Sequence, residues 1–145
     1  MTPFLERFRD GFERVSRTSA DRPAIVEVRP LEPVTVTYSE LADLVARTVG
    51  ALMAAGVAPG GTVVAALPNG LDLAALTLGC LAAGVTLAPV PCTLTGEEAS
   101  RLAHQIRPGV AVLGSLVGHG VVEAFRSADV AVVPPESLVG RGPPR

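Results

Sequence analysis

A strongly apolar stretch in the middle of the chain constrains the fold more than any other feature of the sequence. It runs from Leu67 to Pro91 (LPNGLDLAALTLGCLAAGVTLAPVP), and no charged residue occurs between Leu73 and Gly96. A membrane span needs about 20 predominantly apolar residues, so length alone permits one. Glycine and proline nevertheless interrupt the stretch, at Gly79, Gly84, Pro89 and Pro91. We therefore expect a helix over 71–83, buried on all sides, followed by an interior strand over 85–88.

Periodicity and turn residues predict the elements around this stretch. Two sequences of the capping-box type, Thr37 with Glu40 and Thr95 with Glu98, predict where two helices begin. Thr62 to Leu67 is a near-continuous apolar run, as in a parallel strand covered on both faces. Helices are expected at 4–17, 38–55, 71–83, 96–107 and 119–128, and strands at 24–28, 34–37, 62–67, 85–88, 110–113 and 130–133.

From Thr62 onward strands and helices alternate, which predicts an α/β fold with a doubly wound, mostly parallel sheet and helices on both faces. An N-terminal helix and a small β-hairpin precede this sheet. We expect one unit over residues 1–135 and a disordered Gly/Pro/Arg-rich tail over residues 136–145.

Charge and cysteine usage exclude several classes of protein. The net charge of -2 provides no footprint for nucleic acid or anionic lipid. The N-terminus is charged from residue 6 and lacks the apolar core of a signal peptide. Cys80 and Cys92 show no metal-ligand spacing and are too few for a disulfide scaffold. The sequence thus favours a cytoplasmic protein with two reduced cysteines.

No motif in the chain predicts an active site. The turn Pro68-Asn69-Gly70 precedes a helix and could hold an anion at the helix N-terminus, but it matches no phosphate-loop fingerprint, and a tight turn is favoured. His104 and His119 lack a spaced partner for metal or nucleophile chemistry. Ser39 and Ser115 lack the nucleophile-elbow pattern. We predict no catalytic, no cofactor-binding and no metal-binding residue in this chain.

Several segments, in order, resemble the N-terminal portion of the adenylate-forming superfamily, which includes acyl-CoA synthetases, nonribosomal-peptide adenylation domains and firefly luciferases. They are Asp21-Arg22-Pro23-Ala24, Val36-Thr37-Tyr38-Ser39-Glu40-Leu41, Ala54-Ala55-Gly56-Val57-Ala58-Pro59-Gly60, Leu67-Pro68-Asn69-Gly70 and Leu81-Ala82-Ala83-Gly84-Val85-Thr86-Leu87-Ala88-Pro89-Val90-Pro91. The resemblance covers residues 4 to about 133. It implies ATP-dependent activation of a carboxylic acid to an acyl-adenylate, followed by transfer to a thiol.

The departures from the family pattern concern its chemistry. The phosphate loop ending in Lys, the ribose-binding Asp and the catalytic Lys all belong to later parts of the family's sequence. This chain contains no lysine, and Ala82 stands where the family often has Lys. We therefore expect the chain alone to be inactive, with ATP and Mg bound only in the presence of the missing catalytic segment.

Three functions follow as alternatives. The first is a non-catalytic part of an AMP-forming acid-activating ligase, which needs a complementary catalytic segment or a second copy of itself. A sheet cut after its fourth strand, in a chain with a mean hydropathy of +0.43, would leave apolar surface uncovered. The second is an accessory scaffold of a biosynthetic synthase that has kept the fold without the chemistry. The third is a small-molecule binder that uses the crevice at the carboxyl ends of the strands.

Overall fold

The computed structural model describes residues 3–139 and contains one four-stranded sheet, one two-stranded hairpin and six helices in that part of the chain. The N-terminal elements are α1 (Pro3–Thr18), β1 (Pro23–Glu27), β2 (Val34–Thr37) and α2 (Tyr38–Ala54). The alternating elements that follow are β3 (Thr62–Ala66), α3 (Leu71–Ala83), β4 (Thr86–Pro89), α4 (Gly96–Ile106), β5 (Val110–Leu113), α5 (His119–Ser127), β6 (Ala131–Val133) and α6 (Pro135–Val139).

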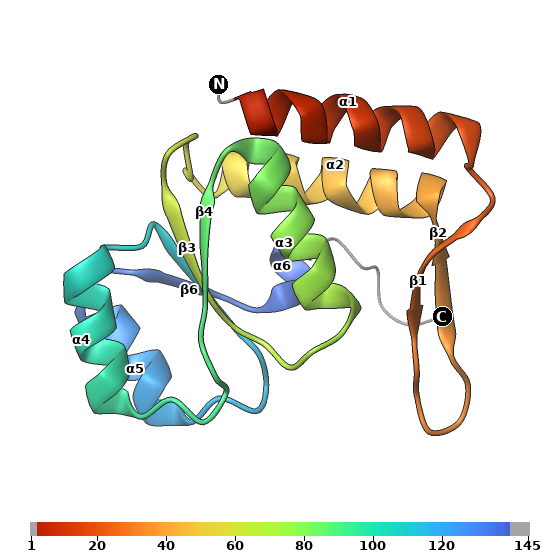
Figure 1. Ribbon diagram of the computed structural model, residues 1–145. Helices are drawn as coiled ribbons and strands as arrows, with labels where there is room; N and C mark the ends of the chain where they lie inside the picture. Colours follow the sequence, from red (N-terminus) through yellow and green to blue (C-terminus); the bar gives the residue numbers. More distant parts are fainter. Residues whose placement is uncertain (1–2, 140–145) are drawn as a thin grey trace.

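The sheet confirms the expected doubly wound α/β fold. Its strand order is β4-β3-β5-β6, and every neighbouring pair is parallel. Helices α4 and α5 cover one face, whereas α2, α3 and α6 cover the other, with α1 lying outside α2 (Figure 1). From β3 the chain crosses through α3 to β4 on one side of β3. It then returns through α4 to β5, which lies on the other side of β3.

Alternation along the central strands builds a separate core on each face of the sheet. Val63 and Ala65 of β3 are buried in the core beneath α2 and α3. Val64 and Ala66 are buried in the core beneath α4 and α5, where Phe125 is the largest fully buried side chain. Because both faces are covered, the strand needs apolar residues at every position.

The apolar stretch from Leu67 to Pro91 forms a helix and a strand as predicted, but two parts of that prediction are wrong. Helix α3 is not buried on all sides, since Thr77 is exposed, and β4 is an edge strand because the chain winds to the other side of β3 after it. Helix α3 ends at Gly84, whose φ of 68° is the left-handed conformation that glycine adopts without strain. The strand begins one residue later than expected, at Thr86. No helix within residues 3–139 is long and apolar enough to cross a membrane.

Both predicted capping boxes are present. The hydroxyl of Thr37 accepts a hydrogen bond from the backbone N–H of Glu40, and the Glu40 carboxylate accepts one from the backbone N–H of Thr37. Thr95 and Glu98 make the same reciprocal pair at the start of α4. These local signals satisfy backbone donors that would otherwise lack a partner, so sequence alone located both helix starts.

Helix α1 is docked at the edge of the molecule. The ring centroids of Phe8 and Phe12 lie 5.7 Å apart in a stacked arrangement, and Phe12 packs against the core. The guanidinium of Arg9 donates hydrogen bonds to the backbone carbonyl of Ala82, near the end of α3. Phe4, by contrast, is 65% exposed, so the apolar side chains of α1 are only partly covered.

The expected disordered tail is wrong for residues 136–139. Pro135 begins the short helix α6, and Leu138 and Val139 are buried in the same core as α2 and α3. Proline is well tolerated in the first turn of a helix, so Pro134-Pro135 ends the last strand and also opens this helix. The rest of the predicted tail, residues 140–145, lies outside the described residues.

Candidate functional site

A small cavity lies at the carboxyl ends of β3 and β5, where the chain leaves neighbouring strands toward opposite faces of the sheet. Such a switch point is the usual place for a ligand in an open α/β sheet. The cavity has a volume of about 180 Å³. Its lining residues are Glu27, Arg29, Leu67, Pro68, Asn69, Gly70, Leu71, Asp72, Gly114, Ser115 and Pro135.

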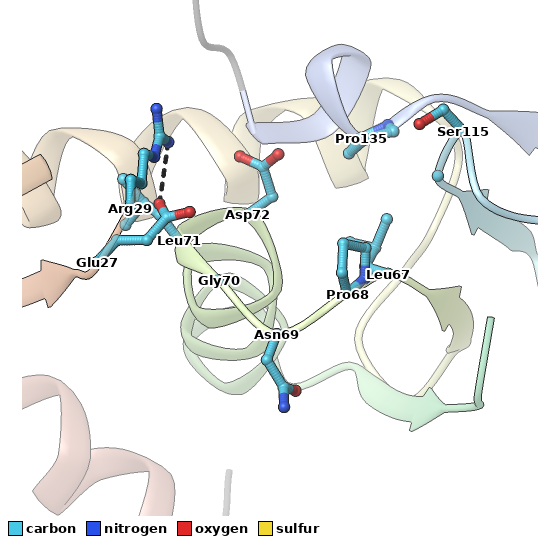
Figure 2. Close-up of a pocket in the computed structure, with 11 residues that line it drawn as sticks. Glu27, Arg29, Leu67, Pro68, Asn69, Gly70, Leu71, Asp72, Ser115 and Pro135 are labelled. Carbon is cyan, nitrogen blue, oxygen red and sulfur yellow. Dashed lines mark hydrogen bonds and ion pairs between the residues drawn. The ribbon is translucent and has the colours of Figure 1, made fainter. Parts of the chain in front are cut away.

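Four separate parts of the chain supply this lining. The β3–α3 turn contributes residues 67–72, and the loop after β5 contributes Gly114 and Ser115. The hairpin contributes Glu27 and Arg29, and the start of α6 contributes Pro135 (Figure 2). The cavity therefore joins the sheet, the hairpin and the last described helix.

Carboxylates surround the N-terminus of α3. A β-carbon on Gly70 would lie 3.3 Å from Oε1 of Glu27, so this carboxylate approaches the helix start closely. Asp72 lies in the first turn of the same helix. Negative charge is favourable there because the helix dipole is positive at its N-terminus. The other oxygen of Glu27, Oε2, lies 3.1 Å from the Arg29 guanidinium (Figure 2).

These residues do not fit ATP with its magnesium ion. The cavity volume is below the roughly 300 Å³ at which small-molecule pockets usually begin. The carboxylates of Glu27 and Asp72 outnumber the one guanidinium, so the cavity would repel a triphosphate. The positive charge of Arg29 is also already paired with Glu27. Within residues 3–139 no group of three or more His, Cys, Asp or Glu side chains could hold a metal ion. The cavity suits a polar structural junction better than a phosphate site.

The structure brings together some of the residues that the sequence singled out. Asn69, Gly70 and Ser115 all line the cavity, although they are far apart in sequence. The Asn69 side chain is directed away from Glu27 and Asp72 (Figure 2). Neither histidine and neither cysteine lines the cavity, so Ser115 has no imidazole beside it there. The Pro68-Asn69-Gly70 segment is part of the short connection between β3 and α3, and the absence of an anion site there stays a prediction.

The two histidines lie on α4 and α5, which pack against each other on one face of the sheet. Nδ1 of His104 lies 2.7 Å from the backbone carbonyl of Ser100. Nε2 of His119 lies 3.8 Å from the Glu123 carboxylate, one turn along α5. Backbone and hydroxyl hydrogen bonds from Thr95 lower the pKa of Glu98, as its capping role requires.

The two cysteines are free thiols in different surroundings. Burial raises the pKa of the Cys80 thiol to about 12, so this side chain stays neutral and unreactive. Cys92 is only partly buried. The two thiols are not bonded to each other.

Sequence reasoning missed Glu27, Arg29 and Asp72 as cavity residues. Asp72 carried one local signal, since an acidic residue in the first turn of a helix complements the helix dipole. Glu27 and Arg29 carried none, because the hairpin comes 40 residues earlier than the turn that it meets, at residues 67–72.

Comparison with known proteins agrees with this fold. The sequence pattern of the AMP-binding enzyme family matches residues 12–139. Phenyloxazoline synthase MbtB from Mycobacterium tuberculosis (strain CDC 1551 / Oshkosh) is 31% identical over 100 residues, which are 69% of this chain and 7% of the synthase. MbtB from Mycobacterium sp. (strain MCS) is 31% identical over 93 residues, which are 64% of this chain and 8% of that synthase.

Solved structures share the architecture. A benzoate CoA ligase from Burkholderia xenovorans LB400 superposes with a TM-score of 0.78 at 22% identity, over 94% of this chain and 29% of the ligase. The N-terminal domain of FACL13 from Mycobacterium tuberculosis gives a TM-score of 0.78 at 24% identity, over 92% of this chain and 35% of that domain. The chain therefore spans a small part of the proteins that it matches. With the family pattern matched across both cores and all four strands of the sheet, this chain belongs to the AMP-binding enzyme family.

Proposed function

We propose that this chain is a non-catalytic scaffold portion of an AMP-forming acid-activating ligase. The observation that carries this proposal is the family match over residues 12–139. In agreement with it, the superposed chain covers only 25–35% of three ligases and ligase domains of the same fold. A complementary catalytic segment then supplies the remaining machinery. This segment is either a separate chain or a continuation of the same protein.

The reaction of the assembled ligase has two steps. The carboxylate of the substrate attacks the α-phosphorus of ATP, which forms an acyl-adenylate and releases pyrophosphate. A thiol then attacks the acyl carbon, which forms a thioester and releases AMP. We assign ATP and magnesium to the complementary segment, because the cavity at the switch point is small and carries two carboxylates. The assembled ligase is proposed to act in the cytoplasm.

Within this scheme, the switch-point cavity serves as a structural junction. Glu27 holds its carboxylate near the start of α3, and Arg29 lies 3.1 Å from it on the same side of the hairpin. Pro135 closes the cavity from the side of α6. The geometry orients the hairpin and α6 relative to the sheet, and in this proposal proton transfer and phosphate binding fall to the complementary segment.

An isotope-exchange assay tests the proposal. The chain, a complementing fragment and their mixture are each incubated with ATP, magnesium, labelled pyrophosphate and a panel of aromatic, fatty and amino acids. The complementing fragment is M. tuberculosis MbtB without the 100 residues that align with this chain. We expect acid-dependent exchange of label into ATP only in the mixture.

Two results would contradict the proposal. Exchange by the chain alone would show that the chain is catalytic. A mixture that shows neither exchange nor binding would show that the chain does not combine with a complementary segment. Tight binding to intact MbtB, without binding to the deleted form, would instead support the accessory-scaffold alternative. Titration calorimetry with ATP and an acyl-adenylate analogue tests the small-molecule alternative, and we expect no heat of binding from the chain alone.

A further inference from the structure

Helix α1 differs from the other described helices in how little of it is buried. It has 16 residues, and none of them is buried. Each of the other five described helices has at least two buried residues, and α6 has two within a length of five. Most of the stability of a surface helix comes from burying its apolar face. Helix α1 therefore gains less stability per residue from packing than its neighbours do.

A few side chains attach the N-terminal half of α1 to the end of α3. The guanidinium of Arg9 donates to the carbonyl oxygen of Ala82, and its Nε lies 2.8 Å from that oxygen. Helix α3 has no basic residue in its own last turn, so Arg9 supplies the cation that complements the negative end of the helix dipole. Leu5 lies beside Gly84, since a β-carbon there would be 3.7 Å from its Cδ1.

Backbone hydrogen bonds hold the connection after α1. The N–H of Ser39 donates to the carbonyl of Ala20, and the N–H of Tyr38 donates to the carbonyl of Arg22. Both donors lie at the start of α2. The connection is thus tied to the body by its main chain, whereas the N-terminal half of α1 is tied by side chains.

A groove of about 690 Å³ separates much of α1 from α2. Phe12 and Ser16 line it from α1, and Val45 and Val49 line it from α2. Apolar atoms that face an open groove lack partner atoms on that side and lose the corresponding dispersion attraction. Helix α1 lies along the outside of α2, away from the sheet, so it can leave without disturbing the strands (Figure 1).

We infer that α1 is a hinged strap, which opens about residues 19–22 while the sheet and both cores stay folded. Arg9 is the latch of this strap, because it connects α1 to the last turn of α3. Opening exposes the apolar side chains of α1 together with the strip of α2 and α3 that they cover. The strap therefore controls how much apolar surface the folded chain presents. This inference does not depend on the proposed function.

Amide hydrogen exchange of the full chain, followed by NMR at several low urea concentrations, tests the strap. Segments with little burial open locally at a lower free energy than the core. After correction for intrinsic rates, we expect the amides of residues 8–15 to exchange about tenfold or more faster than those of β3 and β5. Their exchange should also depend less on urea, because local opening exposes less surface than global unfolding.

The latch is tested by Arg9→Ala, with Arg14→Ala as the matched control. Arg14 lies on the same helix and is exposed. Loss of the hydrogen bonds to Ala82 should speed exchange at residues 8–15 about fivefold or more. The control should leave these rates nearly unchanged. Equal rates in the two variants would show that Arg9 does not hold α1 closed and would overturn the inference.

Phe125→Leu separates opening of the strap from global unfolding. Phe125 is buried in the core beneath α4 and α5, on the face of the sheet opposite to α1 and α2. The cavity should speed exchange in β3 and β5 about tenfold and leave residues 8–15 unchanged. Val121→Ala, in the same core, serves if Phe125→Leu does not fold. If residues 8–15 speed up by the same factor as the strands, α1 opens only when the whole chain unfolds, and the inference is wrong.

Discussion

Replacing Gly79 by alanine tests how tightly α2 and α3 are packed. A β-carbon at this position would lie 2.4 Å from Cγ2 of Thr48 and 2.8 Å from its Cβ. Both residues are buried, and α2 and α3 belong to the same core. Thr48 is held further by the hydrogen bond from its hydroxyl to the carbonyl of Leu44, at 2.8 Å. Glycine thus sets the distance between the helices.

Two effects of the Gly79→Ala substitution oppose each other. Alanine favours the helix over glycine by about 1 kcal/mol. Overpacking a closely packed core costs about 1–3 kcal/mol, and the upper part of this range applies because a β-branched side chain is stiff at χ1. The close approach also involves Cβ of Thr48, which no rotamer change can move. We therefore expect the free energy of unfolding to fall by about 2 kcal/mol.

Urea unfolding followed by circular dichroism measures this change. Gly50→Ala is the matched control, because Gly50 is exposed in α2 and its β-carbon would meet nothing within 4 Å. This control should raise stability by up to about 1 kcal/mol. Thr48→Ser removes Cγ2 but keeps the hydroxyl, so in combination with Gly79→Ala it should recover about 1 kcal/mol.

Two results would contradict close packing between α2 and α3 at Gly79. If Gly79→Ala is as stable as the wild type, or is stabilised like Gly50→Ala, the helices have room for a methyl group. Additive effects of Gly79→Ala and Thr48→Ser would likewise show that the two side chains do not meet.

Three further predictions concern α1, the buried thiol and a helix cap. Arg9→Ala removes the hydrogen bonds to Ala82, so α1 amides should exchange faster and the free energy of unfolding should fall by about 1 kcal/mol. In native protein at pH 8 a thiol reagent should modify Cys92 and spare Cys80, whose pKa is raised to about 12 by burial. Because the unfolded thiol ionises near pH 9, the wild type should lose stability above that pH relative to Cys80→Ala. The pKa of Glu98 is lowered by its hydrogen bonds, so its contribution is present above pH 4.5 and lost as pH falls. Glu98→Gln should remove this acid dependence, measured as the midpoint of unfolding against pH.

Local signals in the sequence predicted most elements because they act within a few residues. The capping boxes at Thr37 and Thr95, the left-handed cap at Gly84 and the apolar strand at 62–66 all satisfy backbone groups or bury side chains locally. The family resemblance came from the same segments and is confirmed by the match over residues 12–139. The prediction failed at α6. Its five residues are too few to show a helical period, and prolines and glycines flank them in the sequence. Burial of Leu138 and Val139 in the core decides their structure instead.

The sequence by itself therefore determined the apolar helix over 71–83, the parallel strands and the absence of lysine, since composition and periodicity are properties of the chain alone. Only the tertiary structure decided which residues meet at the switch point. Glu27 and Arg29 lie near the start of α3 because α2 packs against both the hairpin and α3, and Pro135 joins them because α6 packs on α2 and α3. Contacts between segments 40 or more residues apart depend on how whole elements pack, and no local pattern encodes them.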